Sequence, residues 1–204
     1  RITDELIEVM ATEPKICHYI DIPIQHSSDN VLKGMNRRST EKSIRTTIEK
    51  LKKAIPDIHI RTTLITGFPG ESEEQFTALA EFVKEIRFDR LGCFTYSPEE
   101  NTPAAAYDDQ IEEQVKARRM ELIMEDQYVI AAEKNEEKID RVVEVLIEGW
   151  DDYIKCYFGR SDADAPEIDG RVFFTSAKKL AAGDFVDVRI DGTIDYDLTG
   201  TAVQ

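Results

Sequence analysis

Cysteine, tryptophan and long apolar runs are scarce in this sequence of 204 residues. Its three cysteines, Cys17, Cys93 and Cys156, stand too far apart for the close ligand spacing of zinc and iron–sulfur sites, so we expect reduced and mostly buried thiols. No run approaches the length of a membrane span, and no charged-then-apolar leader opens the chain. The sequence therefore predicts a cytoplasmic protein with no metal site in this segment.

Basic residues are outnumbered as well, with 26 lysines and arginines against 41 acidic residues and a net charge of −15. Such a surface repels phosphate backbones at long range and attracts basic partners, although an acidic surface can also serve solubility alone. Residues 139–204 hold 14 acidic and 7 basic residues, and Lys178-Lys179 is the one suggestion of a local basic patch there.

The first half of the chain alternates between patterns typical of strands and of helices. Such an alternation predicts an α/β fold with a parallel sheet and helical crossovers. Three strands cannot close a barrel or form a stable open sheet, so we expect further strands upstream of Arg1, in a longer protein. The expected helices cover residues 3–12, 29–35, 40–55 and 72–86, and Thr3, Thr40 and Ser72 are expected to cap the first, third and fourth of them. The expected strands cover residues 18–24, 58–66 and 91–96.

The second half changes character at a long charged helix, expected over residues 111–138. We expect its buried side to carry Ile111, Val115, Leu122 and Val129 and to lie against the first domain. Short β-rich runs separated by glycine and aspartate turns follow, and they predict a small antiparallel barrel. The predicted domains are 1–110, 111–138 and 139–204. The five runs cover residues 141–147, 153–158, 171–175, 185–190 and 193–202.

Polar residues follow the first expected strand at Gln25, His26 and Ser27. Ligands of βα folds sit at the carboxyl ends of strands, so these groups could contact a ribose, an amino acid carboxylate or a substrate. The alternative is that Ser28 or Asp29 caps the next helix and the other groups form a solvated loop. No second ligand stands near His26, so we do not expect it to bind a metal.

The second expected strand carries Arg61, Thr63 and Ile65 on one side and ends in a Gly-Phe-Pro-Gly turn that starts at Gly67. The two glycines would let the backbone approach a bound group closely. A charge inside such a strand is costly without a partner, so we expect Arg61 to face the barrel interior in a functional role. Glu71 has a simpler interpretation, as a residue that favours the start of the next helix.

A third polar exit follows the next strand at Tyr96 and Ser97, in a loop that contains Pro98 and Pro103. We call the residues that follow the carboxyl end of a strand its exit. Three successive polar exits indicate a binding site more strongly than any one of them.

The runs YIDIPIQHSSDNVLKGMNRR, IRTTLITGFPGESEEQF and RLGCFTYSPEENTPAA resemble the radical S-adenosylmethionine methylthiotransferases, and the β-rich tail resembles the TRAM domain of those enzymes. The resemblance implies the C-terminal half of a partial TIM-like barrel followed by a small OB-like barrel. It also implies S-adenosylmethionine at the carboxyl ends of the strands and two 4Fe-4S clusters in the complete protein. One cluster would generate a deoxyadenosyl radical, and the other would supply or activate sulfur.

Carried over by position, the resemblance assigns the three strand ends to the cofactor. The family's Cys-x-x-x-Cys-x-x-Cys is not found in this sequence, so we expect this segment to bind no cluster and to be inactive alone. The residues near the ribose and substrate would be Gln25, His26 and Ser27, those flanking adenine and methionine Arg61, Thr63, Ile65 and Gly67, and those of the final exit Tyr96 and Ser97.

Two substrates compete within the family. One branch methylthiolates the β-carbon of an aspartate on small-subunit ribosomal protein twelve, and the other modifies an adenosine of transfer RNA. The acidic balance of residues 139–204 favours a basic ribosomal protein over RNA. A non-catalytic binding module is the third hypothesis, and a cluster-binding cysteine triad upstream would separate it from an enzyme.

Overall fold

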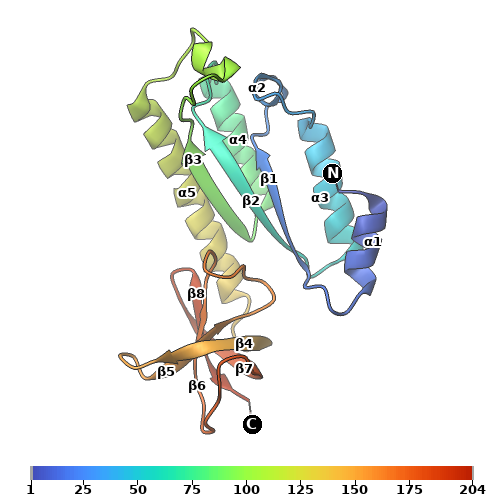
Figure 1. The fold of residues 1–204 in the computed structure, drawn as a ribbon, viewed down its shortest axis with the longest axis vertical. Coiled ribbons are helices and arrows are strands. Elements are labelled where there is room, and N and C mark those ends of the chain that lie inside the picture. The colour runs from blue at the N-terminus through green and yellow to red at the C-terminus, as the bar shows by residue number, and fades with distance from the viewer. Residues whose placement is uncertain (1, 204) are drawn as a thin grey trace. The chain divides into compact units, whose positions relative to one another are not determined.

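A computed structural model describes residues 2–203, and the contacts within it divide the chain into two compact units, shown in one ribbon in Figure 1. One unit comprises Arg1–Ile16 and Ile20–Gln127, and the other comprises Cys17–Tyr19 and Tyr128–Gln204. Across the described residues, no helix combines the length and the apolar character needed to cross a membrane.

The first unit contains a three-stranded sheet in the order β1-β2-β3, which confirms the predicted α/β class. Strands β2 and β3 are parallel, with Arg61 opposite Arg90 and Thr66 opposite Thr95. Its elements are α1 (Asp4–Thr12), β1 (Tyr19–Gln25), α2 (Asp29–Gly34), α3 (Glu41–Ala54), β2 (His59–Thr66), α4 (Glu73–Ile86), β3 (Arg90–Thr95), the 3-10 turn η1 (Pro103–Ala106) and the first part of α5 (Glu113–Glu136).

Hydroxyl side chains set the start of three helices, as the sequence predicted. Thr3 accepts a hydrogen bond from the Leu6 N–H at the start of α1. Reciprocal capping boxes begin α3, between Thr40 and Ser43, and α4, between Ser72 and Gln75. These caps satisfy backbone N–H groups that the helices leave unpaired, and so fix where each crossover helix begins.

Strand β2 has one buried face and one half-buried face. Ile60, Thr62, Leu64 and Thr66 are buried, whereas the residues between them are only half-buried. The predicted alternation is therefore confirmed, with Arg61, Thr63 and Ile65 sharing the less buried face.

The buried side of α5 differs from the predicted apolar stripe. Val115 is 40% exposed and Val129 is 55% exposed, while Ile111 and Leu122 are half-buried, so none of the four predicted residues is fully buried. The helix carries aliphatic residues on more than one side, and the side that is buried includes charged groups whose partners lie elsewhere in the chain. The buried residues are Lys116, Arg119, Ile123, Gln127, Ile130, Ala131 and Asn135.

The second unit closes a five-stranded barrel in the order β4-β5-β6-β8-β7, which confirms the predicted barrel. Strands β6 and β8 run parallel, so the antiparallel prediction is wrong for that one pair. The core consists of Val145, Ile147, Val172, Phe174, Val188, Ile190 and Leu198. The strands are β4 (Val142–Asp151), β5 (Cys156–Arg160), β6 (Val172–Thr175), β7 (Phe185–Ile194) and β8 (Asp197–Ala202).

Residues 153–155, predicted as the start of a strand, instead form the turn of the β4–β5 hairpin. The Asp151 carboxylate accepts the N–H groups of Tyr153 and Ile154, at 2.8 and 3.1 Å, and these bonds hold the turn. The apolar side chains of the turn imitate a strand pattern, although nothing in the core receives them.

Candidate functional site

The carboxyl ends of the three strands form the candidate site. The Tyr96 N–H donates to the Thr66 carbonyl at 2.8 Å, so the exits of β2 and β3 lie side by side. Asp21 contacts Arg61 and the Ile22 carbonyl accepts from the Thr62 hydroxyl, so β1 runs alongside β2 in the same direction. The exits of β1, β2 and β3 therefore share one edge of the sheet, which we call the strand-end rim.

A buried carboxylate, Glu71, joins the first two exits. His26 and Glu71 have fully buried side chains, and His26 Nε2 lies 3.5 Å from Glu71 Oε2. The Ser28 N–H donates to His26 Nδ1 at 2.9 Å, which leaves the proton of a neutral imidazole on Nε2, facing Glu71. The Gly67 N–H donates to Glu71 Oε2 at 2.8 Å, and Arg119 Nη1 donates to Oε1 at 2.9 Å. The charge of Glu71 is thus compensated by a cation and by backbone hydrogen bonding.

Lys116, only 2% exposed, joins the third exit to the same helix, α5. Its Nζ donates to the Tyr96 carbonyl at 3.1 Å and to Glu113 Oε1 at 2.7 Å, and it lies 5.3 Å from the centre of the Tyr96 ring. Buried lysines are costly unless paired in this way. Lys116 and Arg119 therefore anchor α5 to the rim.

The two glycines of the turn have a different role from the predicted one. Gly67 and Gly70 adopt φ values of 72° and 79°, a region that favours glycine. A Cβ atom at Gly67 would overlap Lys116 Cγ, and one at Gly70 would overlap Asp109 Oδ2. Protein side chains therefore fill the space that a side chain at either position would need, and close approach of the backbone to a bound group stays a prediction.

Arg61 lies away from the rim. Its Nη1 pairs with Asp21 Oδ2 at 2.6 Å, and its side chain is 17% exposed. Arg61 precedes Thr66 by five residues, which places it roughly 16 Å along the strand from the β2 exit. Thr63 and Ile65 share its half-buried face and lie between it and the rim.

The other predicted residues divide between the rim and its surroundings. Gln25 adopts a φ of 71° at the end of β1, which turns the chain toward the buried His26. Ser27 is 2% exposed, whereas Ser97 is exposed to solvent. The structure thus brings Gln25, His26, Gly67 and Tyr96 together, and it keeps Arg61 apart from them.

Tyr96 leaves hydrogen-bonding capacity at the rim. Its ring packs edge-on against Phe68, with centroids 5.2 Å apart, and its hydroxyl is buried without a hydrogen-bond partner among the described residues. Buried polar atoms are normally paired, and an unpaired one costs about 1–3 kcal/mol. The Tyr96 hydroxyl is therefore suited to a polar ligand bound at the strand ends.

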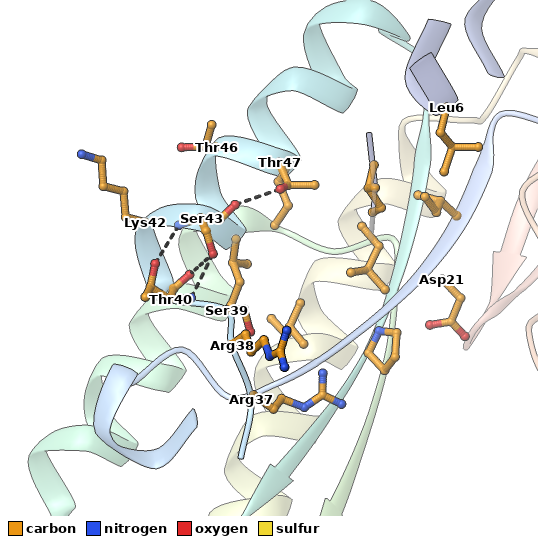
Figure 2. A pocket seen from close by; sticks show the side chains of 17 residues that line it. Leu6, Asp21, Arg37, Arg38, Ser39, Thr40, Lys42, Ser43, Thr46 and Thr47 are labelled. Atoms are coloured by element: carbon orange, nitrogen blue, oxygen red, sulfur yellow. Dashed lines mark hydrogen bonds between the residues drawn. The ribbon is translucent and has the colours of Figure 1, made fainter. Parts of the chain in front are cut away.

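A separate hollow of about 1280 Å³ lies along β1, between that strand, α1 and α3 (Figure 2). Ile20, Ile22 and Ile24 contribute apolar lining, and Arg37 and Arg38 add positive charge. Burial lowers the pKa of the Arg37 guanidinium. None of the predicted site residues lines this hollow, which follows the side of β1 away from β2 in the strand order.

The cysteines are all free thiols. Cys93 and Cys156 are buried as predicted, but Cys17 is exposed, because it precedes β1 in a bend rather than inside an element. Burial raises the pKa of Cys93 to about 12, and burial, followed by the charge of Asp151, raises that of Cys156. Across residues 2–203, no three His, Cys, Asp or Glu side chains are grouped to hold a metal ion.

Three residues of the rim were missed from the sequence: Glu71, Lys116 and Arg119. Glu71 was assigned only to the start of α4, and the other two were assigned no role. One signal was available, since Lys116, Arg119, Ile123 and Gln127 recur at helical spacings of three and four.

Two domain families match this chain: the Radical SAM superfamily over residues 1–83 and the TRAM domain over residues 139–203. A relative from Lachnoclostridium phytofermentans called ribosomal protein uS12 methylthiotransferase RimO is 51% identical over 201 residues, which cover 98% of this chain and 46% of the relative. One of the same name from Geobacter sulfurreducens is 48% identical over 204 residues, covering 100% of this chain and 45% of the relative. The chain spans slightly less than half the length of these relatives.

Among solved structures, the radical SAM enzyme coproporphyrinogen III oxidase (HemN) from Escherichia coli is similar to this chain with a TM-score of 0.51. The match covers 66% of this chain and 30% of that protein, at 19% sequence identity. It therefore shows a shared fold.

Proposed function

We propose that this chain is the carboxyl-terminal part of a radical S-adenosylmethionine methylthiotransferase, an enzyme that methylthiolates ribosomal protein uS12. The modified group would be the β-carbon of an aspartate. The chain would contribute the last strands of the radical SAM barrel in residues 1–110, a connecting helix in 111–138 and the TRAM barrel in 139–204.

One observation carries this proposal: the similarity to proteins named uS12 methylthiotransferase runs through nearly the whole chain at about half identity. It covers the strand-end rim as well as the barrel. The acidic balance of residues 139–204 supports a basic protein substrate, because opposite charge speeds association and selects partners.

The rim is suited to S-adenosylmethionine, since it has an unpaired buried hydroxyl at Tyr96 and a half-buried side chain at Gln25, and Thr63 and Ile65 lie half-buried on the strand face that leads to it. These four residues would hold the cofactor, which supplies hydrogen-abstracting radical chemistry when it is bound. His26 and Gly67 would lie beneath these four residues and hold the strand ends in place, because both contact the buried Glu71. Arg61, paired with Asp21, would face the same barrel interior at greater depth.

Iron–sulfur clusters do not fit the residues described here, so we assign no residue of this chain to a cluster and derive no step through one. In the complete protein, the clusters would be held by the part that precedes this chain. The hollow along β1 is where we place the preceding strands of the barrel, because an apolar groove beside a free strand edge can accept another strand.

The complete protein tests the proposal after reconstitution with iron and sulfide under reducing conditions. We expect it to cleave S-adenosylmethionine and to add one methylthio group to an aspartate of uS12, as measured by peptide mass spectrometry. Modification of transfer RNA with no change in uS12 would reverse the substrate assignment. No cleavage of the cofactor would favour a non-catalytic binding module.

A variant of the complete protein tests the rim separately. Tyr96→Phe removes the hydroxyl and keeps the ring packing on Phe68. We expect the KM for S-adenosylmethionine to rise roughly fivefold, since one hydrogen bond to a ligand contributes about 1 kcal/mol. The matched control is Tyr107→Phe, which alters a ring that also packs on Phe68 but is 37% exposed. An unchanged KM in Tyr96→Phe would remove this residue from the cofactor site.

A further inference from the structure

The turn of the β4–β5 hairpin presents apolar side chains to solvent. Tyr153 is 94% exposed, Ile154 is 53% exposed, and Trp150 at the end of β4 is 44% exposed. We call residues 150–155 the hairpin tip. Exposed aromatic and aliphatic groups gathered in one turn contribute nothing to the core, and such groups commonly mark interaction sites.

The hairpin tip is held in one conformation by its own contacts. Asp151 accepts the N–H groups of Tyr153 and Ile154, and Asp152 accepts the Trp150 Nε1–H at 3.1 Å. A turn fixed before binding loses less conformational entropy when a partner arrives.

Aromatic packing connects the hairpin tip to the barrel core. The Trp150 ring lies edge-on to Tyr157 with centroids 4.8 Å apart, and Tyr157 stacks on the buried Phe174 at 5.7 Å. One part of the Trp150 side chain therefore packs against Tyr157, while another part faces solvent. Supported tryptophan and tyrosine side chains are the residue types that dominate binding energy in protein interfaces.

The charge around the hairpin tip selects among partners. Asp151 and Asp152 lie within the turn, and the Asp152 side chain is 88% exposed. Lys155 is the basic residue of the turn, in an exposed pair with Asp152 at 3.4 Å, and such pairs contribute little. Carboxylates beside aromatic rings attract lysine and arginine side chains, both by charge and through the ring faces, and they repel phosphate.

We propose that the hairpin tip is the contact through which the barrel docks a lysine- and arginine-rich segment of its protein partner. This inference rests on the proposed function, which makes the basic ribosomal protein uS12 that partner. Trp150, Tyr153 and Ile154 bury apolar area against the stems of basic side chains, and Asp151 and Asp152 face their charged ends.

Two nearby lysines make RNA the competing partner. Lys178 and Lys179 follow β6, and the next N–H, that of Leu180, donates to the Tyr157 hydroxyl at 3.0 Å. Their loop therefore contacts Tyr157, the residue whose ring packs against Trp150. Its positive charge is opposed by the acidic excess of the barrel as a whole, so we favour the basic protein.

The test measures binding of uS12 to the complete protein by titration calorimetry, with Tyr153→Ser/Ile154→Ser as the probe variant. Both side chains are exposed, so the fold should survive, and circular dichroism checks this. We expect binding to weaken at least roughly tenfold. The matched control is Ile194→Ser, which removes a side chain that is 59% exposed at the opposite end of the barrel, and it should bind like the unmodified chain.

Charge is tested by Asp152→Asn, which keeps an acceptor for Trp150. We expect weaker binding at low salt and a smaller dependence on salt concentration than in the unmodified chain. An unchanged salt dependence would overturn the role of Asp152.

The remaining outcomes separate this inference from the proposed function. Equal binding by the tip variant and the control would overturn the docking site, while methylthiolation of uS12 by the complete protein would leave the function standing. Tighter binding of transfer RNA than of uS12, lost in Lys178→Ala/Lys179→Ala, would overturn it in favour of RNA. No binding of uS12 by the complete protein would overturn it too, and the methylthiolation assay would then decide the function independently.

Discussion

The two units of this chain bury different kinds of side chain. Around the strand-end rim the buried groups include His26, Glu71, Lys116 and Arg119, and each contacts another part of the first unit. The core cluster of the barrel consists of aliphatic and aromatic side chains, and the buried polar residues of the second unit, Asn135, Ser161 and Asp164, are not part of it. Truncating an apolar core side chain loses buried area and leaves a cavity, whereas removing the partner of a buried charge leaves that charge uncompensated in the interior.

The difference extends to how each sheet ends. The barrel closes on itself, so each of its strands has two neighbours. The sheet of the first unit is open, and its edge strand β1 lies beside an apolar hollow. The barrel can therefore be self-sufficient, while the rim depends on long-range ionic contacts and, in our proposal, on preceding strands.

The largest effect should come from Arg119→Met, which leaves the buried Glu71 carboxylate without its cation. We expect the first unit to lose about 3–5 kcal/mol of unfolding free energy. Urea titration with two signals measures this, because Trp150 is the only tryptophan and its fluorescence reports the barrel, while far-ultraviolet circular dichroism reports the helices.

The matched control for Arg119 is Arg118→Met, which removes an exposed arginine paired with Glu121 and Glu125 and should cost less than about 1 kcal/mol. The double variant Glu71→Gln/Arg119→Met should recover part of the loss, since no charge stays unpaired. Equal costs at positions 118 and 119 would break the contrast between the units.

A comparable loss should follow Leu198→Ala, but in the barrel. Leu198 is 2% exposed within an apolar core, so its truncation should cost about 2–5 kcal/mol through lost burial and a cavity. We expect the Trp150 fluorescence transition to shift to lower urea while the circular dichroism transition of the first unit shifts little. A common shift of both signals would mean that the units unfold as one.

A smaller effect should come from Gly67→Ala. It adds backbone strain at φ 72° and a clash with Lys116, and we expect a loss of about 1–3 kcal/mol. The matched control is Gly183→Ala in the barrel, where φ is 94° and no atom lies within 4 Å of the added Cβ, so only the strain applies. The difference between the two variants, from urea titrations, measures the packing of Lys116 on Gly67. A larger loss at Gly183 would contradict that packing.

The smallest effect should be a gain. Glu144 on β4 lies directly opposite Asp187 on β7, and like charges in this position destabilise a sheet. We expect Glu144→Gln to stabilise the barrel by about 0.2–1 kcal/mol in low salt, with the gain shrinking as salt rises. Thermal unfolding at two salt concentrations measures it, and a loss of stability would show that the two carboxylates have partners.

Local sequence patterns were sufficient where one element decides its own form. The capping residues Thr40 and Ser72 predicted where α3 and α4 begin, and the alternation along β2 predicted that Arg61, Thr63 and Ile65 share one face of the strand. The patterns failed where the outcome depends on distant residues. Tyr153 and Ile154 imitate a strand, but the Asp151 hydrogen bonds place them in a turn.

The candidate site shows the same limit. Strand exits could be located in the sequence, so Gln25, His26 and Tyr96 were found, because the carboxyl ends of parallel strands meet at one edge. Lys116 and Arg119 were not found, since their partners are 20 and 48 residues away in the chain. The buried face of α5 was assigned to the wrong side for the same reason.

The order of residues alone determined the succession of helices and strands, their caps, the closed β-rich tail and the acidic balance. Each of these depends on neighbouring residues or on simple counts. Folding in three dimensions chose which face of α5 is buried, filled the space before Gly67 with Lys116, and left Tyr153 in solvent. Those outcomes require pairing between residues far apart in the chain, and the free energy of a buried charge depends on the partner that it meets there.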